Sequence, residues 1–223
     1  QYLGFILFKR VHQGLVLTAK ALRYYQDVHV IFNKIHESTN NIRFNHKLNS
    51  LQLNISPSIS SLLVAPNIAS FQEKHGNNIN IKASDDNTDL IKGEADIYIR
   101  CSQHKFSNFN NIKLAAEKML MISSRKIATE ISNIADFKTQ NIILHGARPY
   151  IFTNWLKEKS IDINQLKQIS FEHFFMIIEA VRNHVGIAFV PDFLVTNMIK
   201  NQELVNVLNI NYHTDFNYYI LQK

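Results

Sequence analysis

From residue 51 to the carboxyl terminus, short apolar runs with a period of two alternate with longer segments of helical pattern. The first alternating runs are LQLNI at residues 51–55 and INIKA at residues 79–83, and between them Pro66 is placed to start a helix and Gly76 to end it. Further strands are expected at residues 95–100, 119–123, 141–145, 168–171 and 186–190, with helices near residues 150–159, 173–183 and 193–200. This alternation predicts an α/β fold with an open, mostly parallel sheet covered by helices on both faces.

The composition agrees with one large domain or two small ones. The chain has 223 residues, of which 46% are hydrophobic, so a sizeable core can be buried. Its single cysteine, Cys101, excludes an internal disulfide and a Cys-rich zinc site, which fits a reducing cytoplasm. Apolar runs stay far below the roughly 20 residues of a membrane span, and a signal peptide is not visible, so we expect no membrane partner.

The opening segment, LGFILFKRVHQGLVLT at residues 3–18, has the pattern of a β hairpin. Its alternating apolar positions are Phe5, Leu7, Leu15 and Leu17. The turn falls on His12, Gln13 and Gly14, where glycine tolerates a positive φ. We interpret the hairpin as the wing of a winged helix-turn-helix domain, with Lys9 and Arg10 near its tip contacting DNA phosphates.

Charge is concentrated at the same end. Residues 1–50 hold seven Lys or Arg and two acidic residues, a net +5 out of +6 for the chain. An attached nucleic-acid-binding module produces such a distribution, but so does a solvated basic helix face, and charge alone does not separate the two.

Thr18 is a suitable N-cap for a helix over residues 19–37, which lack Gly and Pro. Apolar residues at alternating spacings of four and three form one stripe: Ala21, Tyr25, Val28, Phe32 and Ile35. This stripe fits either pairing with an identical helix in a dimer or packing on its own domain. The Asn-rich segment at residues 38–50 has the composition of a hinge, so we expect domains at residues 1–18, 19–49 and 50–223.

Four phrases of the sequence resemble LysR-type transcriptional regulators. The wing carries Leu3, Gly4, Leu7, Phe8, Arg10, Leu17 and Thr18 at the spacing of that family; the other phrases are SPSISSLLVAP at 56–66, ADIYIR at 95–100 and EAVRNHVGIAFVP at 179–191. The likeness is greatest to the subgroup with the glycine-cleavage activator and the β-lactamase regulator. It implies a dimerising linker helix and a two-lobed effector domain with the fold of type 2 periplasmic binding proteins.

The resemblance also has departures. His184 stands where the family has the first Gly of a Gly-x-Gly turn, which requires a different backbone angle or a local adjustment. The chain begins at Gln1 without the helices that precede the wing in the family, so we expect an N-terminally truncated regulator that lacks its recognition helix. The family also continues beyond the position of Lys223.

In an open α/β sheet, ligands bind beyond the carboxyl ends of the strands. Polar residues at such positions are the candidate effector-binding residues: Ser58, Ser102, Ser123, His145 and His173. Each could instead be structural, Ser58 as an N-cap and the others as partners of backbone groups at strand ends. Arg100 and Asp96 flank an apolar strand, where an ion pair or a capping role is the simpler interpretation.

Catalysis has little support, because the sequence has no Gly-rich phosphate loop, no Gly-x-Ser-x-Gly elbow and no His-Glu-x-x-His helix. Its ten histidines lack ligand spacing, so neither a metal nor another cofactor is expected. We therefore predict a cytoplasmic transcription factor, a homodimer or tetramer that binds DNA and a small-molecule effector. The alternative is a solute-binding protein without a DNA-binding role, which the wing, the basic residues and the linker helix oppose.

Overall fold

The computed structural model describes residues 3–11, 14–43, 50–76 and 78–223. Contacts divide the chain into a first unit, Gln1–Ser50, and a second unit, Leu51–Lys223. The expected turn residues His12 and Gln13, and residues 44–49 of the expected hinge, lie outside the described residues. Within the described ranges, every helix is too short or too polar to cross a membrane.

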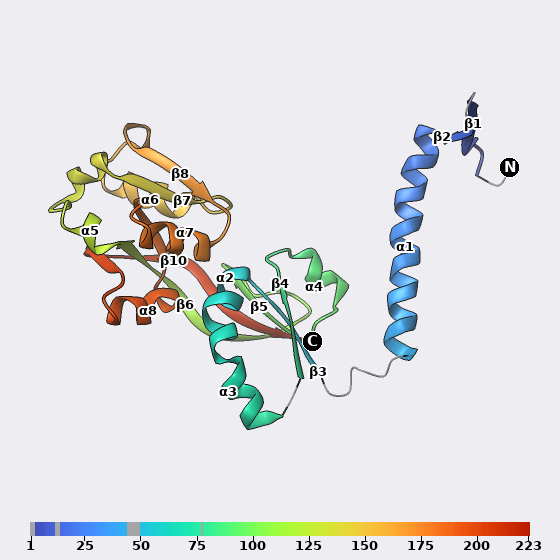
Figure 1. Cartoon of the computed structure of the whole chain (residues 1–223), viewed down its shortest axis with the longest axis horizontal. Helices are drawn as coiled ribbons and strands as arrows, with labels where there is room; N and C mark the ends of the chain where they lie inside the picture. Colours follow the sequence, from blue (N-terminus) through green and yellow to red (C-terminus); the bar gives the residue numbers. More distant parts are fainter. Residues whose placement is uncertain (1–2, 12–13, 44–49, 77) are drawn as a thin grey trace. The chain divides into compact units, whose positions relative to one another are not determined.

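The first unit begins with a two-stranded antiparallel hairpin of β1 (Phe8–Val11) and β2 (Gly14–Leu17), seen in Figure 1. All eight strand residues are exposed, and the register pairs Lys9 with Val16 and Arg10 with Leu15. The predicted hairpin is therefore present, although its first strand starts at Phe8, after the apolar residues expected to open it. Lys9 and Arg10 lie within β1 and not in the turn.

Thr18 joins the hairpin to α1 (Ala19–Arg43). Its hydroxyl accepts a hydrogen bond from the Ala21 amide at 3.1 Å and donates one to the Ile6 carbonyl at 2.8 Å. The predicted N-cap is thus confirmed, and it fixes the hairpin to the helix. The helix runs through residue 43, so the expectation of a non-helical hinge from residue 38 is wrong for its first part. Polar Asn and Ser residues do not break a helix as Gly or Pro would.

The second unit contains one eight-stranded sheet in the order β4-β3-β5-β10-β6-β9-β7-β8. Its strands are β3 (Ser50–Ile55), β4 (Asn78–Ala83), β5 (Ile97–Ser102), β6 (Asn110–Ser123), β7 (Asn141–His145), β8 (Lys167–Phe171), β9 (Ile187–Pro191) and β10 (Val205–Gln222). Its α-helices are α2 (Pro57–Ile59), α3 (Ala65–His75), α4 (Thr88–Lys92), α5 (Arg125–Ala128), α6 (Tyr150–Glu158), α7 (Phe174–Arg182) and α8 (Asp192–Lys200).

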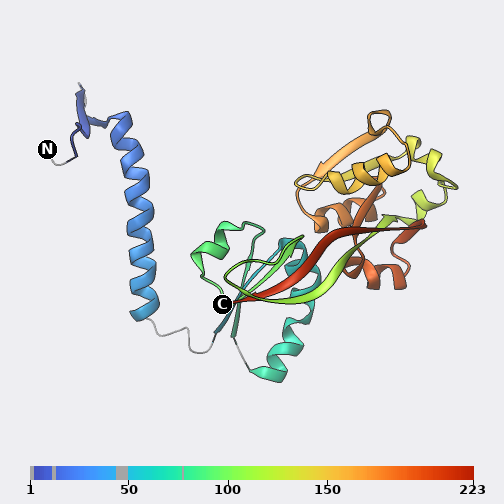
Figure 2. The ribbon, with the colours of Figure 1, turned by 180° about the vertical axis from the view of Figure 1, so that it is seen from behind.

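Two lobes share this sheet. We call β3–β5 with α2–α4 the first lobe, and β7–β9 with α5–α8 the second lobe. The long strands β6 and β10 pair with each other and run through both lobes, as Figure 1 and Figure 2 show. β10 is antiparallel to β5 and β6, and β6 is antiparallel to β9, so the expectation of a mostly parallel sheet is wrong at its centre. Parallel pairs remain within each lobe, β3 with β5 and β7 with both β8 and β9.

The centre of the second lobe is a buried apolar core. β9 is buried at all five positions because it lies between β6 and β7, and α7 buries Phe174, Ile177, Ile178 and Val181 at the spacing of one helix face. Trp155 of α6 is 3% exposed and packs against Phe137, Phe152 and Phe189. The core therefore follows the period-two and helical patterns of the sequence.

The helix after β3 is continuous from Pro57 to His75 but contains a π-helical segment, Ser60–Val64. Pro66, expected to start a new helix, lies in the first turn after this segment, where the wider turn accommodates a residue that cannot donate a backbone hydrogen bond. Gly76 ends the helix with a φ of 67°, as expected, and its amide donates to the Gln72 carbonyl at 2.7 Å.

The turn after α7 shows how the chain accommodates His184. His184 itself takes the left-handed conformation, with a φ of 62°, and its amide donates to the Val181 carbonyl at 3.0 Å. The turn thus keeps the backbone angle that glycine usually provides, with the steric cost of a side chain. Gly186 has a different role: a Cβ there would stand 2.2 Å from the Asn141 carbonyl oxygen, so only glycine allows the approach of β9 to β7.

Candidate ligand-binding site

A cavity of about 260 Å³ lies between the two lobes of the second unit. Ser58 and Arg100 line it from the first lobe, His145 and Phe174 line it from the second, and Phe216 lines it from β10. Because both lobes and the shared strand β10 contribute to its wall, a bound molecule would contact both lobes at once. This geometry is suited to a ligand that sets the arrangement of the lobes.

A fully buried carboxylate lies beside the cavity. Glu117 of β6 is 0% exposed and accepts two hydrogen bonds from the Arg148 guanidinium, at 2.8 and 2.6 Å. The hydroxyls of Thr214 and Tyr218, both in β10, donate to the same carboxylate at 2.6 and 2.9 Å. Arg148 lies in the turn before α6, and its guanidinium stacks over the Phe216 ring at 4.5 Å. These contacts attach the second lobe to both shared strands.

The electrostatics of this cluster follow from burial. Burial acts to raise the pKa of Glu117, but the hydrogen bonds and charge of Arg148 outweigh it and hold the pKa below its usual value. Burial and the nearby Glu117 carboxylate raise the pKa of the Cys101 thiol to about 12. The cysteine is therefore a weakly reactive, protonated side chain.

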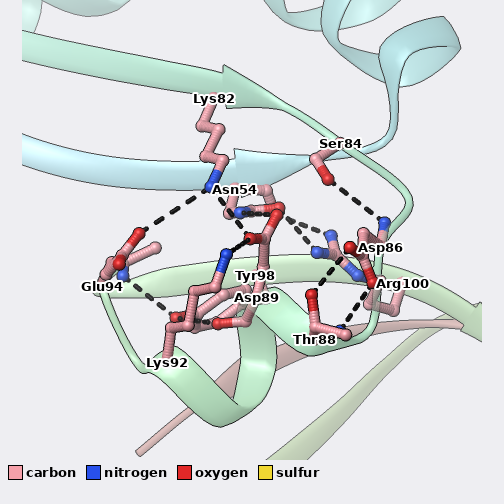
Figure 3. A network of polar contacts seen from close by, with 11 residues as sticks. Asn54, Lys82, Ser84, Asp86, Thr88, Asp89, Lys92, Glu94, Tyr98 and Arg100 are labelled. Carbon is pink, nitrogen blue, oxygen red and sulfur yellow. Dashed lines mark hydrogen bonds and ion pairs between the residues drawn. The ribbon is translucent and has the colours of Figure 1, made fainter. Parts of the chain in front are cut away.

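Arg100 of β5 is also buried, at 4% exposed, but it has a different environment. One terminal nitrogen donates to the Asn54 and Ile99 carbonyls at 3.0 Å each, and the other donates to the Asn54 side-chain oxygen at 2.6 Å. Figure 3 shows the rest of this network, in which the Asn54 amide donates to Asp89 and Asp89 pairs with Lys82 at 2.8 Å. The hydrogen bond from Lys82 holds the pKa of Asp89 well below its usual value.

The expected ion pair between Arg100 and Asp96 is not formed, because the Asp96 carboxylate accepts instead from the Gln52 amide at 2.8 Å. Asp96 therefore fills the capping role that the sequence left open. Arg100 is held by neutral oxygen atoms only, and among the described residues it forms no ion pair within 4.0 Å.

Two of the five candidate effector residues line the cavity. Ser58 is 6% exposed, and its hydroxyl accepts a hydrogen bond from the Phe175 amide at 3.2 Å, a contact between the lobes. His145 ends β7, and its ring lies 4.4 Å from the Phe174 ring. Burial lowers the pKa of His145 to about 4, and the nearby Arg148 charge acts in the same direction, so the ring is neutral at neutral pH.

The other three candidates do not line the cavity. His173 precedes α7 at the rim, with its Nδ1 3.8 Å from the Asp85 carboxylate of the first lobe. Ser102 accepts from the His104 amide at 3.1 Å, and Ser123 is fully buried and donates to the Ser124 carbonyl at 3.0 Å. Neither serine is part of the cavity wall. The structure thus groups Ser58, His145 and, at the rim, His173, whereas the effector role of all five residues stays a prediction.

Sequence reasoning missed Glu117, Arg148 and Arg100 as components of the site. A signal for Glu117 was present, since it is the acidic residue in the run LAAEKMLMI at residues 114–122, which is apolar apart from Glu117 and Lys118, and a buried acid requires a cationic partner. Nothing in the sequence marked Arg148 as that partner, because it lies 31 positions away in a polar turn.

A larger cavity of about 550 Å³ lies beside α3 and is lined mainly by apolar side chains, including Leu63, Phe71 and Phe193. Its wall offers few polar groups to orient a ligand. The smaller cavity combines two arginines, a histidine and serine hydroxyls with an apolar surface, which is the usual composition of a specific ligand site. We therefore take the cavity between the lobes as the candidate site.

The fold and the cavity define the class of protein, a ligand-binding domain of two α/β lobes joined by shared strands. Residues 45–221 match the model of the LysR substrate binding domain. The chain therefore belongs to the family of LysR substrate-binding domains, the effector-binding part of LysR-type transcriptional regulators. This confirms the resemblance found in the sequence and the two-lobed fold that it implied.

Similar proteins support the same assignment. The glycine cleavage system transcriptional activator of Escherichia coli K12 is 23% identical over 212 residues, which cover 93% of this chain and 70% of that protein. The effector binding domain of AmpR from Citrobacter freundii superposes with a TM-score of 0.67 at 15% identity, over 78% of this chain and 88% of that one. Full-length AphB from Vibrio cholerae covers all of this chain, with a TM-score of 0.62, 15% identity and 79% of that chain. A regulator is thus favoured over a solute-binding protein.

Proposed function

We propose that this chain senses a small molecule in the cavity between its lobes and transmits the binding event to DNA-contacting segments, as a cytoplasmic homodimer or tetramer. The observation that carries the proposal is a cavity with polar and apolar lining whose wall is built from both lobes and from β10. A ligand there shifts the arrangement of the lobes only if it binds one arrangement more tightly than another. The contacts of Ser58 with Phe175 and of Asp85 with His173 join the lobes and would change with that arrangement.

The hairpin of the first unit supplies the proposed DNA contacts. Lys9 and Arg10 are exposed in β1, on opposite faces of the hairpin, and the surrounding first 50 residues carry a net +5. Phosphate contacts of this kind orient a protein on DNA without reading base sequence. We therefore assign to Lys9 and Arg10 a positioning role and not a role in operator recognition.

Arg10→Ala is expected to weaken the binding of the chain to every DNA duplex alike and to reduce the slope of log affinity against log salt by about 1, the contribution of one phosphate contact. Fluorescence anisotropy titrations against unrelated duplexes at several salt concentrations measure both quantities. Lys200→Ala, an exposed lysine in α8 of the second unit, is the matched control and should leave the slope unchanged. A loss confined to one duplex sequence would contradict the phosphate-contact role.

The stripe on α1 supplies the proposed dimer contact. Tyr25, Phe32 and Ile35 are 53%, 65% and 55% exposed, Val28 is partly buried, and Ala21 is buried near the hairpin. Large apolar side chains along one face of a 25-residue helix favour pairing with a second helix. We propose that a second copy of α1 covers them.

Phe32→Glu should therefore weaken self-association by at least tenfold, because it places a charge in the centre of the apolar stripe. Val30→Glu is the matched control: Val30 is 66% exposed on the same helix, but two positions away it faces a different direction. Sedimentation velocity over a concentration series measures the dissociation constants. Equal effects of the two substitutions would show that the stripe is not the contact surface.

A further inference from the structure

Two buried polar atoms lack a hydrogen-bond partner within the described part of the chain, Arg100 Nε and His145 Nδ1. Both residues line the cavity between the lobes, Arg100 from the first lobe and His145 from the second. An unpaired buried polar group costs about 1–3 kcal/mol, so folded proteins supply partners for nearly all of them. The coincidence of both atoms in one cavity indicates that a ligand supplies the partners.

Arg100 is fixed in place for such a contact. Its two terminal nitrogens are used by the Asn54 and Ile99 oxygens, which leaves Nε as the N–H group without a partner. Asp89, the carboxylate attached to this network in Figure 3, is already paired with Lys82 and Lys92. The positive charge of Arg100 therefore has no direct counter-ion within 4.0 Å among the described residues.

The other charges near the cavity cancel that of Arg100 only in part. Arg148 and Glu117 neutralise each other through two hydrogen bonds. Asp85 also lines the cavity, and its charge acts on Arg100 as well as on His173, but its side chain is 53% exposed, so water screens it and it compensates Arg100 only in part. A neutral His145 adds a hydrogen-bonding nitrogen without charge. The cavity wall thus presents one cation that forms no direct ion pair among the described residues, and a second nitrogen from the opposite lobe.

We propose that the effector is a small organic carboxylate, whose oxygens accept hydrogen bonds from Arg100 Nε and His145 Nδ1 while its carbon skeleton packs on Ile59, Phe174 and Leu194. This inference rests on the proposed function of the cavity as the effector site. Two unpaired nitrogens match the two oxygens of a carboxylate, whereas a phosphate would need more donors. The volume equals that of roughly nine water molecules at about 30 Å³ each, which limits the ligand to a small acid.

A carboxylate in this position would also join the lobes, because one oxygen contacts each of them. Among the described residues, the contacts between the lobes at this place include the neutral Ser58–Phe175 hydrogen bond, the weak Arg148–Cys101 hydrogen bond and the exposed Asp85–His173 pair. A buried charged bridge is stronger than any of these, since hydrogen bonds to ionised groups contribute about 1.5–3 kcal/mol. Ligand binding then favours the arrangement in which Arg100 and His145 face the same anion.

The test measures binding of carboxylates and their matched amides to the whole chain by calorimetry and thermal shift. The probes are acetate, propanoate and benzoate, each paired with acetamide, propanamide or benzamide, with inorganic phosphate at the same ionic strength. At least one acid should bind in the micromolar to millimolar range and raise the melting temperature, and its amide should bind at least tenfold more weakly.

Variants locate the contact. Arg100→Lys keeps the charge but removes Nε, and it should weaken binding of the acid by about 10- to 100-fold. His145→Phe keeps an aromatic ring beside Phe174 and removes Nδ1, so it should weaken the acid about tenfold in a folded protein even if Arg100→Lys does not fold. Arg182→Lys, at an exposed arginine paired with Glu179, is the matched control and should leave the affinity unchanged.

The carboxylate assignment would be overturned if acids and their amides bind equally well. It would also be overturned if neither Arg100→Lys nor His145→Phe changes the affinity for an acid. If an amide binds and His145→Phe removes that binding, the cavity is still the effector site and only the ligand class is wrong. If no probe binds at millimolar concentration, the carboxylate assignment falls as well. The proposed function would then depend on the DNA-binding titrations of Arg10→Ala, which do not involve the cavity.

Discussion

Glu117→Gln is expected to lower the melting temperature of the chain by roughly 10 °C. The substitution removes the charge that neutralises Arg148, while the Glu117 position is 0% exposed and the Arg148 side chain only 15%. Removing one partner of a buried ion pair costs about 3–5 kcal/mol, because the other charge stays buried without compensation. In a protein of this size each kcal/mol corresponds to about 2–4 °C. Calorimetric melting of both proteins measures the difference.

Glu179→Gln is the matched control for that result. Glu179 also pairs with an arginine, Arg182, at 3.0 Å, but its side chain is 61% exposed. Exposed ion pairs contribute at most about 1 kcal/mol, so the melting temperature should change by no more than a few degrees. Similar melting temperatures for the two variants would mean that Glu117 does not hold Arg148 as the geometry indicates.

A double substitution separates the ion pair from its surroundings. Arg148→Met in the Glu117→Gln background removes the uncompensated charge and should recover a large part of the lost stability. Recovery should be incomplete, because the Arg148 guanidinium also donates to the Tyr150 hydroxyl and stacks over Phe216. The stability of the cluster therefore belongs to the group of side chains and not to one bond.

The sequence predicted the elements of the second unit that repeat a regular pattern. The strand at residues 141–145 and the helix of the FFMIIEAVR segment were anticipated because strict periodicity survives folding when one face is buried. The two longest strands extend beyond what the local pattern indicates: β6 begins at Asn110, nine residues before the strand expected at residues 119–123, and β10 runs from Val205 to Gln222. Their pairing with each other supplies the order that the local pattern lacks.

The site was predictable only in part, for a similar reason. Ser58 and His145 were found because they follow strands, and the ends of strands are defined by local sequence. Arg100 and the Glu117–Arg148 pair depend on contacts between positions more than 30 residues apart. The topology of the sheet decides which neutral or charged group a buried arginine contacts. That topology cannot be read from the local pattern of a single sequence.

His145 should make the stability of the chain depend on pH between about 4 and 6.5. Its pKa is about 4 in the folded protein, because burial and the Arg148 charge disfavour the protonated ring, against 6.5 in an unfolded chain. Above pH 6.5 the ring is neutral in both states, and its contribution to stability is fully present. As the pH falls from 6.5 to 4, the unfolded state binds a proton that the folded state excludes, so unfolding becomes easier.

The expected loss for this one residue is about 3 kcal/mol across that range, at about 1.4 kcal/mol per pH unit. Guanidinium unfolding of the chain and of His145→Phe at a series of pH values isolates the contribution of His145, because all other titrating groups are common to both proteins. The difference in the free energy of unfolding should change steeply below pH 6.5 and be constant above it. His145→Asn, which also cannot titrate, should give the same curve.

If the difference in the free energy of unfolding between the two proteins does not change with pH, His145 is hydrated or paired in solution. It would then no longer count as an unsatisfied group of the cavity. If this difference depends steeply on pH, and the dependence weakens when a carboxylate is added, the His145 ring contacts the bound acid. An anion beside the ring favours its protonated form, so a bound acid raises the pKa of His145 toward its unfolded value and removes the penalty. The pH dependence of stability therefore reports whether the nitrogen of His145 meets the ligand.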